Sequence, residues 1–410
     1  MDNNGFRGER LKSARLFRGM TLSELAERTN LSKQSLSQYE NGSKPDIQRV
    51  LTIAQVLGFP MEYFLQADGC KTATEVTYFR SLATATKMSR TAQSIKLEYV
   101  AKMYEILAQY VSFPALNLPD ISFVGTDDEF DNAAQEAMYE EIEAIAMKVR
   151  DHWGLGRSPI ENLQLTLEEN GIVVTGFDTS DSKIDAFSQR TLLDNGDVYF
   201  IAVSQGEKPK GRIFFDMAHE LGHILLHPWS ESLDLISKEE FKTRESQANM
   251  FASAFLLPKE SFLREVQAYP TDLNYYLHLK KRWNCSMQAM IVRAHQLKAI
   301  TDNQYQYMMR QVSKRGWRTQ EPGDAPYYLN ENIFQGAIDV LFEAEYLTPA
   351  TLLRLFKKYG VTLYASDIEE LLHLRKDTLK VDTGAARIIQ LNLKRPDMEE
   401  ANANTEEPKE

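Results

Sequence analysis

The chain has 410 residues, of which 43% are hydrophobic and 26% are charged, and its formal net charge is −11. This composition is that of a globular protein, and the negative charge argues against nucleic-acid binding over most of the surface. Two cysteines provide no disulfide framework and no apolar stretch approaches the roughly 20 residues of a membrane span, so we expect a cytoplasmic protein with no membrane partner.

The first 68 residues predict short helices joined by tight turns. Thr21-Leu22-Ser23-Glu24 is a capping box, so a helix begins after Thr21. Ser32 can cap the next helix, over residues 33–41, and Gly42 ends that helix as a glycine just beyond its last turn. Two short helices joined in this way have the geometry of a helix-turn-helix motif.

The second of these helices carries the residues that we expect to contact DNA. Residues 1–66 contain nine Lys and Arg against seven Asp and Glu, so a DNA-binding role belongs to this segment of an acidic chain. Leu36 and Tyr39 are its apolar residues and are expected in the core. Gln can bind adenine with two hydrogen bonds, and Lys can reach guanine or phosphate. The residues left for the outer face are Lys33, Gln34, Ser35, Ser37 and Gln38.

This segment resembles the XRE/Cro-type helix-turn-helix family. The matching residues are Leu25-Ala26, Ser32, Leu36-Ser37, Tyr39-Glu40-Asn41-Gly42 and Pro45. The resemblance implies sequence-specific binding to a double-stranded DNA operator through the major groove, usually as a homodimer on a palindrome. The alternative is a small helical bundle that contacts only protein. We interpret Glu40 as a structural residue at its helix end and not as one that recognises a base.

Residues 69–130 predict a polar, helical linker. After it, Ser158-Pro159-Ile160-Glu161 is a second capping box, which predicts a helix that ends before Gly171. Residues 172–175 have the pattern of a strand, and Asn195-Gly196 predicts a hairpin turn between two further strands. A small, mostly antiparallel sheet is therefore expected in the middle of the chain.

His219-Glu220-Leu221-Gly222-His223 is the strongest chemical signal in the sequence. Histidines four apart on a helix lie about 40° apart around its axis, so both imidazoles can reach one metal ion. Glu220 points away from that pair and is placed to contact a metal-bound water as a general base. The pattern is typical of zinc peptidases, in which zinc lowers the pKa of its water to about 7.

A catalytic zinc site needs a third protein ligand. Glu245 shares a helix face with Ala248 and Ala252, so its carboxylate is expected to be buried and to need a partner. His227 lies four residues after His223, a spacing that favours a residue lining the site or capping the helix over a third histidine ligand. Three acidic residues compete with Glu245 but are expected to face solvent: Glu231, Glu239 and Glu240.

The surroundings of this motif resemble the ImmA/IrrE family of zinc metallopeptidases, over roughly residues 135–325. The matching stretches are residues 184–188, 214–227 and 245–258. The resemblance implies that His219, His223 and Glu245 bind Zn²⁺, with Mn²⁺ as the alternative ion, and that Glu220 is the general base. It also implies a protein substrate, often a transcriptional repressor. We further hypothesise that the hairpin around Asn195 offers a sheet edge to an extended substrate.

The patterns together predict an α+β protein with an N-terminal all-α helix-turn-helix domain and a zincin-like metallopeptidase domain with a small, mostly antiparallel sheet. The expected divisions are residues 1–68, the linker 69–130, the peptidase domain 131–325, a helical module 326–395 for packing, dimerisation or ligand sensing, and a disordered acidic tail 396–410.

The expected function is a DNA-binding regulator that cleaves a repressor, or itself, in response to stress. One alternative is an XRE transcription factor whose peptidase-like domain senses a ligand or metal without proteolysis, and another is a DNA-tethered interaction protein.

Overall fold

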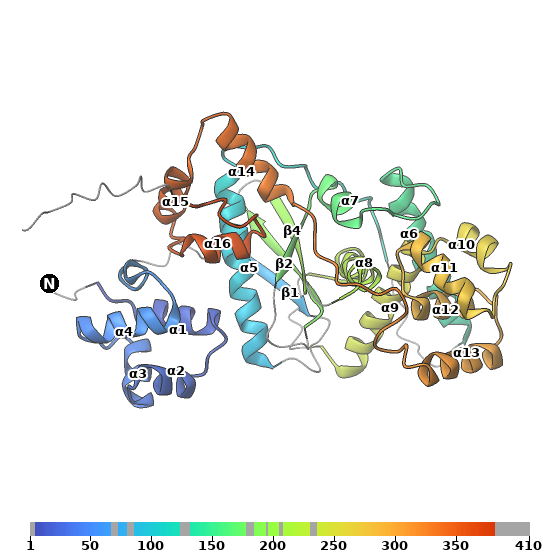
Figure 1. Cartoon of the computed structure of the whole chain (residues 1–410), viewed down its shortest axis with the longest axis horizontal. Helices are drawn as coiled ribbons and strands as arrows, with labels where there is room; N and C mark the ends of the chain where they lie inside the picture. Colours follow the sequence, from blue (N-terminus) through green and yellow to red (C-terminus); the bar gives the residue numbers. More distant parts are fainter. Residues whose placement is uncertain are drawn as a thin grey trace, which may run out of the picture.

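The computed structural model describes residues 5–66, 73–79, 86–123, 132–177, 184–193, 196–204, 208–229 and 236–381. These residues form many helices around one small sheet (Figure 1). Asn195, Glu231 and the acidic tail, which carried predictions, lie outside the described residues. Among the described helices, none has the length and apolar character that crossing a membrane requires.

The N-terminal helices begin and end where the sequence predicts. Thr21 accepts a hydrogen bond from the Glu24 backbone N–H, and the Glu24 carboxylate accepts one from the Thr21 N–H at 2.6 Å. Ser32 accepts a hydrogen bond from the N–H of Ser35, and so caps the next helix. The elements are α1 (Gly8–Phe17), α2 (Leu22–Thr29), α3 (Lys33–Glu40), α4 (Ile47–Leu57) and the 3-10 helix η1 (Met61–Leu65).

The segment predicted as a helical linker contains a strand as well as a helix. Helix α5 (Lys87–Leu107) is present, but strand β1 (Ala73–Phe79) precedes it, so the helical prediction is wrong for residues 73–79. β1 pairs antiparallel with β3 (Ala186–Leu193), more than 100 residues later in the chain. The threonine, valine and aromatic residues of β1 favour a strand, and the partner that stabilises it is distant in sequence.

The sheet has the strand order β1-β3-β4-β2, with β2 spanning Ile172–Phe177 and β4 spanning Gly196–Ser204. β3 pairs antiparallel with both of its neighbours, and β2 pairs parallel with β4. Two of the three pairings are therefore antiparallel, as predicted. The hypothesis that the hairpin around Asn195 offers a sheet edge to a substrate is wrong for β4, because β4 lies between β3 and β2. β3, the other strand of this hairpin, pairs with β1 on its outer side.

The two faces of the sheet are covered by different groups of helices (Figure 1). Val174 and Ile201 face a core that includes Met217 of α8 (Lys210–Leu226), with α9 (Lys238–Leu256) packed on α8. Phe187 and Phe200 face a second core, which holds α5, the C-terminal helices and the helix-turn-helix domain. The remaining elements are α6 (Asn132–His152), α7 (Leu163–Glu169), α10 (Lys259–Val266), α11 (Leu273–Trp283), α12 (Met287–Gln296), α13 (Asp302–Lys314), α14 (Ile333–Glu343), α15 (Pro349–Lys358) and α16 (Ala365–Leu371).

Helix α7 begins later than the capping box at residues 158–161 predicts. Its N-cap is Asn162, whose side chain accepts a hydrogen bond from the Leu165 N–H at 3.1 Å. The buried guanidinium of Arg150 donates hydrogen bonds to the backbone carbonyls of Gly156 and Ser158. Arg150 also donates a hydrogen bond to the distant Phe255 carbonyl at 2.6 Å. These contacts hold the loop before α7, so the local capping signal at Ser158 is not used.

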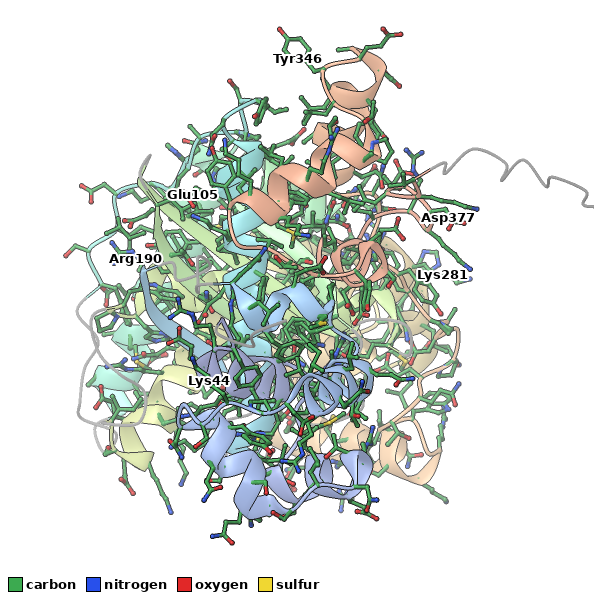
Figure 2. All side chains as sticks on the ribbon, turned by 90° about the vertical axis from the view of Figure 1, so that its left-hand side faces the viewer. Lys44, Glu105, Arg190, Lys281, Tyr346 and Asp377 are labelled. Carbon is green, nitrogen blue, oxygen red and sulfur yellow. The ribbon has the colours of Figure 1, made fainter. Side chains whose placement is uncertain are left out.

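The helix-turn-helix domain is docked on the C-terminal helices and on α5. Arg18 forms a two-pronged ion pair with Asp367 of α16, with both N–O distances at 2.9 Å. The fully buried Arg10 donates hydrogen bonds to the Gly360 carbonyl at 3.3 Å and to the Tyr99 hydroxyl of α5 at 3.5 Å. The residues predicted as a linker and as a separate module thus share a core with the N-terminal domain. Figure 2 views the molecule from this domain.

The buried carboxyl of Glu168 on α7 is expected to make the stability of the fold depend on pH. Burial raises the pKa of this carboxyl to about 8, although hydrogen bonds from Ile333, Gln164 and Val174 oppose the shift. Because the folded chain retains a proton that the unfolded chain releases near its ordinary pKa of 4.5, the unfolding free energy falls as pH rises from 4.5 towards 8, by roughly 1 kcal/mol per pH unit.

Glu168→Gln should remove this component and should stabilise the chain at pH 8 relative to the parent. Urea unfolding at pH 5.5 and pH 8 measures the difference between the two proteins. The matched control is Glu169→Gln, which changes the exposed neighbouring carboxylate and should leave the slope with pH as in the parent. An unchanged slope in the Glu168 variant would contradict the assignment.

Candidate functional site

Helix α8 carries the histidine motif into the interior of the molecule. Ile213 and Met217 on this helix are fully buried against the sheet, which fixes the rotation of the helix about its axis. His219 and Glu220 are fully buried, and His223 is 1% exposed. The helix ends at Leu226, before His227-Pro228.

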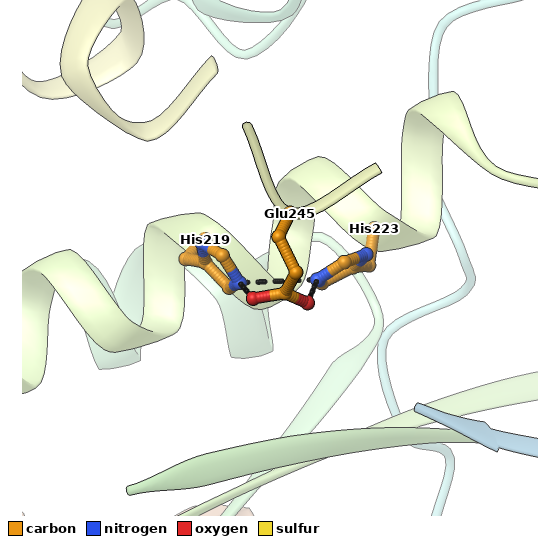
Figure 3. A group of neighbouring side chains, drawn as sticks. All are labelled: His219, His223 and Glu245. Atoms are coloured by element: carbon orange, nitrogen blue, oxygen red, sulfur yellow. Dashed lines mark hydrogen bonds and ion pairs between the residues drawn. The ribbon is translucent and has the colours of Figure 1, made fainter. Parts of the chain in front are cut away.

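The side chains of His219, His223 and Glu245 meet between α8 and α9 (Figure 3). The two Nε2 atoms are 3.0 Å apart. Glu245 Oε1 lies 3.2 Å from His223 Nε2, and Glu245 Oε2 lies 3.5 Å from His219 Nε2. All the candidate ligand atoms lie within 4.8 Å of one another. Two imidazole nitrogens and one carboxylate that converge in this way have the chemistry of a divalent-cation site, and they fit zinc.

The two histidines stabilise the ionised form of the Glu245 carboxylate. Burial alone would raise the pKa of this carboxyl, but hydrogen bonds and charge interactions with His219 and His223 lower it to about 2. The carboxylate is therefore ionised at neutral pH, as a metal ligand must be. Two of the competing acidic residues are elsewhere: Glu239 and Glu240 are exposed, and Glu240 forms an ion pair with Arg244.

Gly222 allows α8 and α9 to approach closely enough for Glu245 to reach the histidines. A Cβ atom at this position would lie 3.1 Å from the Ala248 Cα and 3.2 Å from the Phe251 ring. Gly222→Ala should therefore push the two helices apart, lower the unfolding free energy by about 1–3 kcal/mol and weaken metal binding.

Thermal unfolding with and without added Zn²⁺ would measure both effects. The control is Gly336→Ala in α14, where a Cβ atom meets nothing within 4 Å. That substitution should be neutral or stabilising, because alanine favours a helix interior over glycine. Equal melting temperatures for the two variants would show that the approach of α8 to α9 is not constrained at Gly222.

The other ring nitrogens of the histidines are held by a set of polar contacts. His219 Nδ1 lies 3.1 Å from Asn249 Oδ1. His223 Nδ1 lies 2.9 Å from His227 Nδ1, and His227 Nε2 lies 3.0 Å from Gln247 Oε1. Contacts of this kind fix the tautomer and the ring orientation of histidine ligands. Burial, followed by the charge of His223, lowers the pKa of His227 well below its ordinary value, so His227 is neutral in this chain of contacts.

Glu220 contacts the sheet. The Ser188 hydroxyl on β3 donates a hydrogen bond to Glu220 Oε2 at 2.6 Å, and both residues are fully buried. No role was predicted for three residues around this centre, although they lie within the stretches that resemble the ImmA/IrrE family: Ser188, Gln247 and Asn249. Asn249 follows Glu245 by one helical turn, a spacing that could have indicated it. Ser188 and Gln247 are brought in only by tertiary contacts.

The residues predicted to contact DNA lie on α3 as expected. Lys33, Gln34 and Gln38 are exposed, and Ser35 and Ser37 are partly exposed. Leu36 and Tyr39 of the same helix are buried, which directs the polar face outwards. Glu40 forms a two-pronged ion pair with Arg15 of α1, with distances of 2.6 and 3.1 Å. This contact is structural, in agreement with the interpretation of Glu40 from the sequence.

Comparisons with known families match two parts of the chain. A family model described as helix-turn-helix matches residues 11–64. A second model, described as an IrrE N-terminal-like domain of the M78 peptidases, matches residues 167–295, which contain β2, β3, β4, α8 and α9. A search of curated proteins found no match. The chain therefore joins an XRE-type helix-turn-helix domain to an ImmA/IrrE-type peptidase-like domain.

Proposed function

We propose that the chain is a DNA-binding regulator with zinc-dependent endopeptidase activity, and that it cleaves a transcriptional repressor, or itself, under stress. The observation that supports this function best is the cluster of the buried His219 and His223 with the partly buried Glu245. Glu220, the residue after His219 on the same helix, is buried beside it. Mn²⁺ is the alternative ion for this donor set.

The proposed mechanism assigns a separate task to each side chain. His219 and His223 would hold the ion through Nε2, and Glu245 through its carboxylate. Zinc, when bound, polarises the scissile carbonyl and makes water a stronger acid. Glu220 accepts the proton of the attacking water and delivers it to the leaving amine. Ser188 is a positioning residue, because its hydroxyl donates a hydrogen bond to Oε2 of Glu220 and so orients that carboxylate.

A second candidate function is metal or ligand sensing without proteolysis. The docking of the helix-turn-helix domain favours it, because Arg18 is paired with Asp367 and Arg10 is buried against Tyr99. A conformational change in the peptidase-like domain would then move α3 through these contacts. In this case Glu220 would be dispensable, whereas the two histidines and Glu245 would still be needed for the response to metal.

Incubation of the purified chain with candidate XRE-type repressors tests the first function. We expect discrete repressor fragments that appear with Zn²⁺, disappear with a chelator and are absent with Glu220→Gln. Promoter regulation that persists in the Glu220→Gln strain, without any fragment of a repressor or of the chain itself, would favour sensing. A chain that neither cleaves nor responds to metal would contradict both functions.

The DNA-binding role predicts different effects for two residues of α3. Lys33→Ala should weaken binding to all DNA sequences and reduce the slope of log affinity against log salt by about 1, because it removes one phosphate contact. Gln34→Ala should cost about 1–3 kcal/mol at one operator position and relax specificity there. Fluorescence anisotropy with operator and mutated operators measures both. The control is Gln55→Ala, on an exposed position of α4, which should leave affinity unchanged.

A further inference from the structure

The peptidase-like part of the chain does not by itself contain all strands of the sheet. The region matched as IrrE-like, residues 167–295, supplies β2, β3 and β4 in the order β3-β4-β2. In that three-stranded unit one side of β3 is an edge. β1 comes from residues 73–79, outside the matched region, and it pairs with β3 along this edge.

The occupied edge belongs to the strand that contacts Glu220. The Ser188 hydroxyl on β3 holds Glu220 at 2.6 Å, and the residue of β1 paired with Ser188 is Tyr78. The neighbouring pairs are Thr77 with Gln189 and Phe79 with Phe187. The backbone of β1 thus runs one strand away from the residue that positions the proposed general base. Figure 3 shows the sheet, with β1 in blue, next to the clustered side chains.

An edge strand presents a row of backbone N–H and C=O groups that an extended polypeptide can pair with. Main-chain hydrogen bonds then provide affinity, and side-chain pockets add selectivity. β1 is bound in this way, antiparallel to β3 over Ala73–Phe79, with a register irregularity between Thr74 and Val76. Its pairing therefore demonstrates which backbone direction and register the edge of β3 accepts.

We propose that the outer edge of β3 is a strand-addition site for an extended segment of a protein substrate, and that residues 73–79 are its intramolecular occupant. The proposal rests on the proposed function, since it makes this edge the substrate-binding strand of the peptidase. A substrate segment binds antiparallel to β3, is rich in β-branched and aromatic residues like Thr74–Phe79, and requires β1 to leave. Pairing of β1 therefore competes with substrate binding and lowers the affinity of the chain for substrate.

A peptide-binding assay tests the proposal without relying on turnover. The probe is a fluorescent peptide with the sequence of residues 72–80, and a scrambled peptide is the control. All proteins carry Glu220→Gln, so that the probe is not consumed. Thr77→Pro removes a backbone N–H from β1, whereas the matched Thr77→Ala retains it. We expect Thr77→Pro to bind the probe at least about tenfold more tightly than Thr77→Ala, because the edge is released.

A second variant guards against misfolding of the proline variant. It replaces residues 73–79 with seven Gly and Ser residues, and circular dichroism confirms its fold. If a folded variant of either kind binds the probe no better than the Ala control, or binds the scrambled peptide equally well, the proposal is overturned. Probe binding by the folded variants, together with no cleavage of any repressor by the matching Glu220 proteins, would contradict the peptidase function and leave the strand-addition site supported. Cleavage of a repressor at the same rate by the parent and by the β1 variants would support the peptidase function and contradict the strand-addition site.

Discussion

Glu220→Gln is expected to lower the rate of repressor cleavage by roughly 10²–10⁴-fold, which is the usual contribution of a general acid–base residue. The amide has nearly the shape of the carboxylate, and its oxygen can still accept the hydrogen bond from Ser188. It cannot accept a proton from water at neutral pH. The fold, the bound metal and the affinity for DNA should therefore remain, and only the chemical step should fail.

Single-turnover cleavage with excess enzyme, together with zinc content measured on the same samples, checks this expectation. The matched control is Glu239→Gln, which removes one carboxylate from an exposed position of α9 and should cleave at the parent rate. A Glu220→Gln protein that retains zinc and cleaves as fast as the parent would show that another group transfers the proton.

Glu245→Ala is expected to lower zinc affinity strongly. Loss of a residue that only hydrogen-bonds to a metal ligand lowers metal affinity by roughly 10–100-fold, and loss of Glu245 itself should lower it by more. The substitution removes the only carboxylate of the described cluster and leaves two imidazoles, too few for a catalytic zinc site. His227→Ala provides the comparison, because it removes only the group that contacts His223 Nδ1. We expect the order of affinity to be parent, then His227→Ala, then Glu245→Ala.

Competition with a chromogenic chelator measures the three affinities. The control is Glu239→Ala, on the same helix and exposed, which should bind zinc as the parent does. Stability without metal is measured separately, so that a folding defect is not mistaken for a lost ligand. Parent-like zinc affinity in a folded Glu245→Ala protein would remove this residue from the ligand set and with it the main support for proteolysis.

The features that the sequence determined by itself depend on contacts within about one helical turn. The capping box at Thr21 and Glu24 closes over three residues, so the start of α2 follows from local composition. The spacing of His219 and His223 places both rings on one side of α8 in the same way. Glu245 could also be predicted as a ligand from the sequence, because its place among small residues on one helix face indicates a carboxylate that needs a partner.

Only the tertiary structure decided the features that depend on distant partners. β1 became a strand because β3 supplies its hydrogen bonds, and that pairing also determined which edge of the sheet is occupied. Ser188 reaches Glu220 across the gap between the sheet and α8, and Asp367 reaches Arg18 from the opposite end of the chain. Strand pairing and buried polar contacts join residues whose separation in sequence carries no periodic signal, whereas helix caps and helical faces do carry one.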